Sequence, residues 1–229
     1  MYKNIKVIAF DADDTLWVNE PYFREVEHNF AKLLSAYETE NTINQELFKK
    51  EMDNLELYGY GVKGFVLSMV ESAIELSNNK ITALEIEKIL DFGKSMITKK
   101  IELLDGVEEV LTALSPKYKL ILATKGDLLD QERKLQKSGL MNHFDHIEVL
   151  SDKKVQNYKR LIEFLDVKPS EFLMIGNSLK SDVLPLINLG SEAIHVPYHT
   201  TWVHEEVDSH DEHEGYKTVK TLTEILAFL

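Results

Sequence analysis

Short apolar runs, separated by segments with helical periodicity, constrain the fold of this chain more than any other feature. The runs are Ile5–Phe10, Lys119–Ala123, His146–Leu150, Phe172–Ile175 and Ala193–Val196. They are rich in β-branched and other apolar side chains, as expected of strands buried on both faces. Helical patterns between them are Val107–Leu114, Leu128–Ser138, Val155–Leu165 and Leu179–Leu189. This alternation predicts an α/β, Rossmann-like fold with a parallel sheet and helices on both of its faces.

A long segment after the first run breaks the alternation, because it shows helical periodicity and no strand pattern. One apolar stripe at helical spacing consists of Phe23, Val26, Phe30, Leu33 and Leu34. Thr82–Glu85 matches the capping-box pattern at the start of a further helix. Asp105–Glu108 matches the same pattern at the start of the predicted helix Val107–Leu114. We therefore expect residues 19–102 to form an all-helical cap inserted into an α/β core made of residues 1–18 and 103–229.

Composition and charge exclude several classes of function. The formal net charge of −13 opposes a general affinity for nucleic acid or for an anionic membrane surface. The sequence has no cysteine, which excludes disulfides, thiolate metal sites and cysteine nucleophiles. We see neither a signal-peptide pattern nor an apolar run long enough to span a bilayer. We therefore expect a cytoplasmic protein without a nucleic-acid or membrane partner, and the sequence does not indicate its oligomeric state.

Three aspartates, Asp11, Asp13 and Asp14, follow the first apolar run directly. Like charges this close repel each other, and burying them is costly unless something compensates. A solvated acidic turn would avoid the cost. A ligand site is the alternative, because ligands of open α/β sheets bind beyond the carboxyl ends of the strands, where the helical insert is expected.

Polar side chains also follow the other predicted strands. They are Thr124 and Lys125 after the second run, Lys153 and Lys154 after the third, and Asn177 and Asp182 after the fourth. Taken singly, each has an ordinary structural explanation, such as a helix cap or a solvated surface charge. Parallel strands end at one edge of their sheet, so the sequence brings a hydroxyl, lysines and another carboxylate to the edge where Asp11 lies.

Together these residues resemble the motifs of the haloacid dehalogenase superfamily of phosphohydrolases. Asp11–Thr15 matches its Asp-x-Asp-x-Thr motif, Thr124 matches its hydroxyl at a strand end, and Gly176–Asp182 matches its last motif. The resemblance covers about residues 5–17 and 104–200, and the order of all the motifs makes it specific. The helical insert is similar to the cap that this superfamily carries between its first two motifs.

The lysine of the superfamily has two candidates here. Lys153 is the first choice because it lies shortly before Tyr158, at the expected entry of a helix. Lys154 is its direct neighbour and stays an alternative.

The resemblance implies a mechanism for these side chains. Asp11 would be the nucleophile that attacks phosphorus and forms an aspartyl-phosphate. Asp13 would give a proton to the leaving alcohol and later take one from the water that hydrolyses the intermediate. The groups that would bind the phosphoryl oxygens are Thr124, Lys125 and Lys153.

A magnesium ion is also implied by the resemblance, since this cation prefers oxygen ligands. Its implied ligands are the Asp11 carboxylate, the Asp13 carbonyl and Asp182, with Asn177 nearby. The superfamily commonly has an aspartate at the position of Asn177. An amide can still bond a metal-bound water but carries no charge, so we expect weaker magnesium binding. Thr15 is expected to brace the loop by hydrogen bonding.

Asp13 distinguishes branches of the superfamily. Members that resemble true dehalogenases need no metal and lack an aspartate there, and ATPase-like members carry threonine. The chain is therefore expected to be a magnesium-dependent phosphatase of a small phosphorylated metabolite, which the sequence does not identify. A phosphomutase and a non-catalytic binding protein that keeps the fold are the alternatives.

Other features leave their role open or have a plain structural explanation. Tyr58–Phe65, rich in glycine and aromatic residues, is either a cap loop over the active site or a simple turn between helices. In the first case Tyr60 or Lys63 would touch the substrate. Asp14 is expected to be a solvent-facing turn residue, and His204–Lys217 is expected to be a surface loop.

Several histidines cluster near the end of the sequence. They are His195, His199, His204, His210 and His213. Their spacing fits no zinc motif, so we expect solvated or hydrogen-bonded side chains. Residues 195–202 are expected to form a loop after the last strand of the core.

Overall fold

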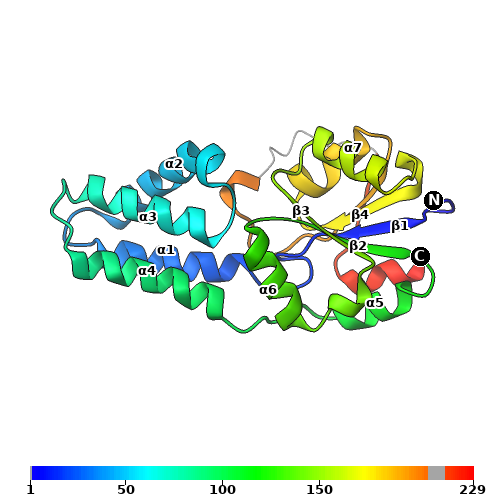
Figure 1. Cartoon of the computed structure of the whole chain (residues 1–229), viewed down its shortest axis with the longest axis horizontal. Coiled ribbons are helices and arrows are strands. Elements are labelled where there is room, and N and C mark those ends of the chain that lie inside the picture. Colours follow the sequence, from blue (N-terminus) through cyan, green and yellow to red (C-terminus); the bar gives the residue numbers. More distant parts are fainter. Residues whose placement is uncertain (1, 206–214) are drawn as a thin grey trace. The chain divides into compact units, whose positions relative to one another are not determined.

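The structure of the chain is a computed structural model that describes residues 2–205 and 215–229. It divides into two compact units (Figure 1). The α/β unit comprises residues 1–20, 101–125 and 131–229, and the helical unit comprises residues 21–100 and 126–130. The segment 126–130, which the sequence placed in the core, thus belongs to the helical unit.

Within the described residues, six strands form one parallel sheet in the order β3-β2-β1-β4-β5-β6. They are β1 Val7–Phe10, β2 Lys119–Lys125, β3 His146–Leu150, β4 Phe172–Gly176, β5 Glu192–His195 and β6 Lys217–Thr218. The helices outside the long insert are α5 Val107–Leu114, α6 Leu128–Ser138, α7 Val155–Phe164 and α8 Leu184–Ile187. The predicted α/β fold is confirmed, and β6 is a strand that the sequence did not reveal.

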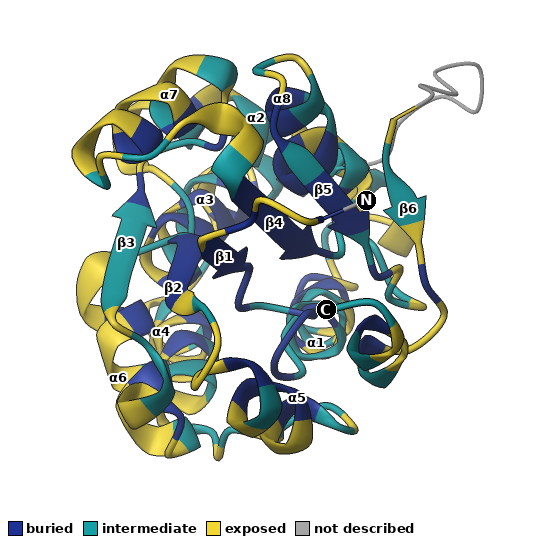
Figure 2. Ribbon diagram, turned by 90° about the vertical axis from the view of Figure 1, so that its right-hand side faces the viewer, coloured by how far each residue is buried: buried dark blue, intermediate teal, exposed yellow. Residues whose placement is uncertain are grey.

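The sheet is covered on both faces, as its continuous apolar strands predict. Ile8 and Phe10 of β1 belong to a core that includes the apolar side of α5. Val7 and Ala9 point to the opposite face and share a core with α7. Figure 1 places α5 and α7 on opposite sides of the sheet, and Figure 2 shows β1 and β4 buried along their length. Strands of this kind need no polar alternation, because neither face meets water.

The predicted helix Leu179–Leu189 instead begins with a wider π-helical turn, Leu179–Val183, which α8 follows. Pro185 has no N–H that could bond to the carbonyl of Ser181. The N–H of Leu184 bonds to the carbonyl of Leu179, five residues back, whereas in an α-helix the acceptor would lie four residues back. The Tyr158 hydroxyl donates to the freed Ser181 carbonyl at 3.0 Å. A tyrosine of α7 thus fixes the turn that carries the last motif.

One of the two predicted capping boxes is present. The Thr82 hydroxyl accepts the Glu85 N–H, and the Glu85 carboxylate accepts the Thr82 N–H. The box expected at Asp105–Glu108 is wrong, because Gly106 precedes α5 without a side-chain cap. Gly106 has a φ of +79°, and a Cβ there would lie 2.3 Å from Thr223 Cγ2. Backbone conformation and close packing, rather than capping, thus set the start of α5.

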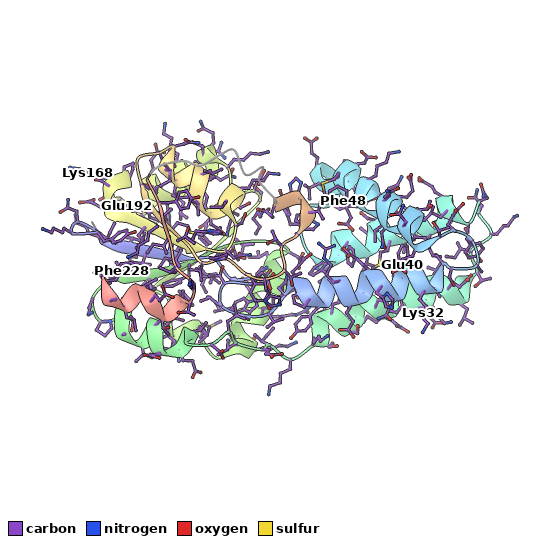
Figure 3. The ribbon with its side chains drawn as sticks, turned by 180° about the vertical axis from the view of Figure 1, so that it is seen from behind. Lys32, Glu40, Phe48, Lys168, Glu192 and Phe228 are labelled. Atoms are coloured by element: carbon purple, nitrogen blue, oxygen red, sulfur yellow. The ribbon has the colours of Figure 1, made fainter. Side chains whose placement is uncertain are left out.

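The C-terminal region differs from expectation in one respect. Residues 196–202 follow β5 without regular structure, as expected, but β5 is not the last strand, since β6 pairs with it. Within the stretch His204–Lys217, residues 206–214 lie outside the described part of the chain. After β6 a 3₁₀ segment, Leu222–Ala227, leads to Phe228 (Figure 3). The Phe228 ring stacks on Tyr2 at 5.5 Å between centroids.

The helical unit contains four long helices among its described residues. They are α1 Glu20–Leu33, α2 Glu40–Tyr58, α3 Val62–Leu76 and α4 Ala83–Thr98. The predicted apolar stripe of α1 lies in the core of this unit, where Phe30 and Leu34 are fully buried. Ile43, Met69 and Ile89 contribute to the same core from the other three helices. No helix within the described residues is both long and apolar enough to cross a membrane.

We expect Gly93→Ala to destabilise the helical unit. Alanine is the better helix former by about 1 kcal/mol. A Cβ at this position of α4 would however lie 2.4 Å from Val66 Cγ2 of α3, and a β-branched side chain has few rotamers to escape. The clash should cost about 1–3 kcal/mol and outweigh the gain, as measured by thermal or denaturant unfolding. The double variant Gly93→Ala/Val66→Ala removes the clashing methyl and should recover part of the loss; equal stability of wild type and Gly93→Ala would contradict this packing.

Candidate active site

The candidate site lies where the strand order reverses, between β1 and β4. The chain winds from β1 through β2 to β3 on one side, and then returns to place β4 on the other side of β1. Ligands of open α/β sheets bind at such a switch point, beyond the carboxyl ends of the strands. Asp11 and Asn177 directly follow the two strands, and the Asp11 N–H donates to the Ile175 carbonyl of β4 at 2.9 Å.

A buried ammonium group between two carboxylates forms the centre of the site. The Lys153 side chain donates to Asp11 and to Asp182, and the second of these bonds is 2.6 Å long. All three residues are at most 6% exposed. Lys154 points elsewhere, with its side chain 79% exposed and paired with Asp152 at 2.8 Å. Of the two candidate lysines, the structure thus brings Lys153 to the aspartates.

Burial dominates the electrostatics of this centre. Burial raises the pKa of Asp11, and the Lys153 ammonium lowers this pKa by a smaller amount. The nearby Asp182 carboxylate raises the pKa of Asp11 further. Burial would also lower the pKa of Lys153, but the two carboxylates outweigh it and raise that pKa. Two carboxylates therefore share one ammonium, and the centre keeps an excess of negative charge when both are ionised.

The backbone around Asp182 fixes the position of its carboxylate. Its Oδ2 accepts the Ser178 N–H at 3.0 Å. A Cβ on Gly176, the last residue of β4, would lie 2.3 Å from the same oxygen. Only glycine at this position lets the carboxylate approach the end of the strand.

Thr15 and Asn177 complete the floor of the site. The Thr15 hydroxyl donates to Asp11 Oδ2 at 3.0 Å and accepts the Asn177 N–H at 3.1 Å. In the amide orientation that satisfies its neighbours, the Asn177 nitrogen donates to Asp11 Oδ2 at 3.1 Å and to the Asp13 carbonyl at 3.3 Å. Thr15 has the bracing contacts that the sequence suggested. An aspartate in place of Asn177 would meet these oxygens with repulsion.

The Asp13 side chain is held by several hydrogen-bond donors. Trp17 Nε1 donates to Oδ1 at 2.6 Å, and Gln131 Nε2 donates to Oδ2 at 2.8 Å. Lys134 Nζ contacts both oxygens, at 3.0 and 3.2 Å. None of these three donors was among the residues expected from the sequence.

The interpretation of Asp14 as a solvent-facing turn residue is wrong. Its side chain is buried, and its carboxylate accepts the N–H groups of Asn19 and Glu20 where α1 begins. It therefore satisfies N–H groups that the first turn of a helix leaves open. Burial raises the pKa of Asp14 to about 7. The residue has a φ of +61°, a conformation that aspartate tolerates better than most residues.

Two residues that follow the second predicted run occupy different surroundings. Thr124 is buried at the end of β2, with its hydroxyl 3.2 Å from the Lys125 carbonyl. The Lys125 ammonium donates to Ser181 Oγ at 2.9 Å and to Glu205 at 2.5 Å. Lys125 therefore reaches the segment of the last motif rather than Asp11.

Glu205 is a functional candidate that sequence reasoning missed. Besides Lys125, its carboxylate accepts the hydroxyls of Ser178 and Ser181, and its side chain is 11% exposed. Despite burial, these donors lower the pKa of Glu205 to about 2. The residue joins the loop after β5 to the turn that carries Asp182. It lay in a stretch interpreted as a surface loop, where a single acidic residue gives no signal.

Three of the histidines that cluster near the end of the sequence lie within the described residues. His195 Nε2 is 3.0 Å from the Asn177 carbonyl, so this nitrogen carries the donated proton. The His199 ring lies beside Tyr198 with the two ring planes tilted by 46°, and the His204 ring lies beside Trp202 with a tilt of 51°. His210 and His213 lie outside the described residues.

The glycine-rich stretch Tyr58–Phe65 forms a turn between α2 and α3 in the helical unit. Gly59 and Gly61 have φ values of +70° and +103°, which favour glycine. Lys63 Nζ pairs with Asp127 at 2.9 Å within the same unit. Whether the turn also has a role in substrate binding stays a prediction.

Oxygen atoms of the kind that a small, hard cation prefers as ligands lie near Asp11, beside the Lys153 ammonium. They comprise the Asp11 and Asp182 carboxylates, the Asp13 carbonyl and, with its amide turned, the Asn177 oxygen. Among the described residues, no three side chains of the metal-binding types His, Cys, Asp or Glu are grouped together. Magnesium suits such a sparse set, because it usually keeps several waters and needs only one or two carboxylates.

We expect Glu205→Gln to lower the stability at neutral pH by about 3 kcal/mol, the free energy that corresponds to the lowered pKa of this carboxyl. Because the folded-state pKa lies below the usual value of 4.5, the contribution is complete above pH 4.5 and is lost as the pH falls towards 2. Unfolding in urea at several pH values measures the difference between the two proteins. Glu163→Gln, a change of an exposed glutamate on α7, is the matched control. A difference that does not shrink on acidification would contradict the assignment.

Comparisons with known proteins agree with this geometry. Residues 5–190 match the family model described as haloacid dehalogenase-like hydrolase. N-acylneuraminate-9-phosphatase from Mus musculus is 24% identical over 216 residues, which cover 88% of this chain and 83% of that protein. A haloacid dehalogenase-like family hydrolase from Xanthomonas campestris is 38% identical, with a TM-score of 0.85, over 95% of this chain and 87% of the other.

A more distant structure shares the fold. The HAD-hydrolase YfnB from Bacillus subtilis, in a structure bound to magnesium, is 18% identical with a TM-score of 0.64, over 98% of each chain. The family match spans most of the sequence, and the expected resemblance is confirmed. The chain belongs to the haloacid dehalogenase-like hydrolases.

Proposed function

We propose that the protein is a magnesium-dependent phosphatase that hydrolyses a small phosphorylated metabolite through an aspartyl-phosphate on Asp11. One observation carries the proposal: a buried Asp11 carboxylate at the end of the central strand, in contact with the Lys153 ammonium and the Thr15 hydroxyl. A carboxylate held by such donors at a sheet switch point is oriented to attack a bound phosphoryl group.

The proposed reaction has two steps. In the first, a carboxylate oxygen of Asp11 forms a bond to phosphorus while the bond to the ester oxygen breaks, and that oxygen leaves with a proton from Asp13. In the second, water attacks the phosphorus of the aspartyl-phosphate, Asp13 takes a proton from this water, and the Asp11 carboxylate is released with inorganic phosphate. Asp13 thereby returns to its starting state.

Positive and polar groups of the chain stabilise the charge of the phosphoryl group in this proposal. Lys153 would contact the phosphoryl oxygens from its position beside Asp11, and Thr124 would donate its hydroxyl from the end of β2. Lys125, paired with Glu205, would contribute less directly. Residues 19–102 would act as a cap that sets the choice of substrate.

Magnesium is proposed as the cofactor on the basis of the oxygen atoms near Asp11 and the excess negative charge there. When bound, it would neutralise charge on the phosphoryl group and on Asp11. The magnesium bound by YfnB, which has the same fold, supports this choice. Asp11, Asp182 and the Asp13 carbonyl would hold the ion, and Asn177 would lie beside it.

The substrate class is proposed as small phosphate monoesters. The N-acylneuraminate-9-phosphatase relatives make phosphorylated sugar acids a reasonable first group in a substrate panel. Proteins that are 24% identical often act on different substrates, so the panel should also include other phosphorylated metabolites.

We expect Asp11→Asn to abolish hydrolysis of p-nitrophenyl phosphate while the protein stays folded, because an amide oxygen is a poor nucleophile. Release of nitrophenolate with magnesium, and with a chelator in its place, measures the effect. Asp166→Asn, which changes an aspartate just beyond α7, is a control for the loss of a carboxylate elsewhere and should keep full activity. Turnover by purified Asp11→Asn within tenfold of wild type would overturn the proposed nucleophile.

We expect magnesium to raise the melting temperature, because it binds the folded site and hardly binds the unfolded chain. At a hundred times the dissociation constant the stabilisation is about 2.7 kcal/mol, which corresponds to a shift of about 5–11 °C for a protein of this size. Asp182→Asn should reduce this shift sharply because it removes a proposed ligand. Asn177→Asp should keep or enlarge the magnesium-induced shift. Without magnesium this variant should melt at a lower temperature than wild type, because the new carboxylate would face Asp11 and the Asp13 carbonyl. Identical responses of wild type and Asp182→Asn would show that the metal site is misplaced.

A further inference from the structure

We propose that Lys134 and Gln131 of α6 are positioning residues that hold the Asp13 carboxylate for proton transfer, an inference that rests on the proposed phosphatase function. Neither residue belongs to the motifs by which the sequence resembles its family. Both lie far from Asp13 in the sequence, so their role becomes visible only in the folded chain.

Three donors hold the Asp13 carboxylate in place. A carboxylate offers about four lone-pair sites on its two oxygens. Oδ1 accepts from Trp17 Nε1 and from Lys134 Nζ, and Oδ2 accepts from Gln131 Nε2 and again from Lys134. The side chain is thus fixed in both position and rotation, as precise proton transfer requires.

Lys134 is itself anchored. Its ammonium donates to Asn19 Oδ1 at 2.8 Å, and its side chain is only 15% exposed. A lysine on a helix surface is usually solvated and mobile, and an exposed ion pair contributes little. Here Asp13 and Asn19 both contact the Lys134 ammonium, so the Lys134–Asp13 ion pair has one preferred arrangement.

Gln131 is oriented by two acceptors at once. Its Nε2 donates to Asp13 and to the Lys125 carbonyl, both at 2.8 Å, and the residue is 3% exposed. Its Oε1 is buried and has no hydrogen-bond partner among the described residues. Because the oxygen of the buried Gln131 amide forms no such bond within the described part of the chain, the hydrogen bonds of its nitrogen determine the orientation of this side chain. The nitrogen binds Asp13 and the end of β2, which carries Thr124.

In the first step, which kcat/KM reports, proton transfer from Asp13 matters only when the leaving group needs a proton; the second step, in which Asp13 takes a proton from water, is the same for every ester. Nitrophenolate is a stable anion and leaves without one, whereas phenolate is much more basic. Phenyl phosphate and p-nitrophenyl phosphate have similar size and the same phosphoryl group. A comparison of the two therefore separates the placement of Asp13 from general damage to the site.

The experiment measures kcat and kcat/KM of wild type and variants for both esters with magnesium. Lys134→Met keeps the stem and removes the charge, and we expect its kcat/KM for phenyl phosphate to fall about tenfold or more beyond any loss for p-nitrophenyl phosphate. Gln131→Met should show the same selectivity, and Lys134→Arg should restore part of the phenyl phosphate activity. Lys137→Met, on an exposed position of the same helix, is the matched control and should change neither rate.

A double-mutant cycle with Asp13 makes the test specific. If Lys134 acts through Asp13, then Asp13→Asn/Lys134→Met should lose no more phenyl phosphate selectivity than Asp13→Asn alone. Equal losses of kcat/KM on both esters, or additive losses of kcat/KM in the double variant, would overturn the positioning role. Absence of magnesium-dependent hydrolysis of either ester by folded wild type would instead overturn the proposed function, on which the positioning role depends. Thermal melts of every variant identify those that are unfolded, and the two α6 variants give independent readings.

Discussion

The contact of one buried lysine with two buried aspartates is the interaction on which the rest of the site depends. Lys153 lies between Asp11 and Asp182, and water reaches none of the three freely. Removing one partner from such a group would leave an uncompensated buried charge, which is strongly destabilising. A single ammonium does not balance two ionised carboxylates, and the proposed magnesium ion would compensate the remaining charge.

The α/β fold brings these groups together from distant parts of the sequence. Asp11 ends the central strand, Lys153 precedes α7, and Asp182 lies in the π-helical turn before α8. Tyr158 of α7 bonds the carbonyl that Pro185 leaves open in this turn, so the helix that follows Lys153 also fixes the backbone of Asp182. Positioning and charge thus come from the same contacts. The unusual turn is part of the site rather than an irregularity of the fold.

Local patterns in the sequence predicted the sheet, most helix positions and the side chains that gather at the strand ends. What they could not predict depends on distant partners. Asp14 was misjudged because its burial comes from capping α1. Glu205 carries no motif, and its role follows only from Lys125 and two serines that the fold brings to it. Lys134 resembles any lysine of an exposed helix until its contact with Asp13 is known.

Chemical trapping of the intermediate tests whether Asp11 becomes phosphorylated during turnover. Borohydride reduces an aspartyl-phosphate to homoserine, which peptide mass spectrometry locates in the sequence. With phosphate ester and magnesium present, we expect homoserine at position 11, with none when the ester is omitted. Reduction at another residue, or an unmodified Asp11 in protein quenched while it turns over, would contradict a phosphorylated Asp11.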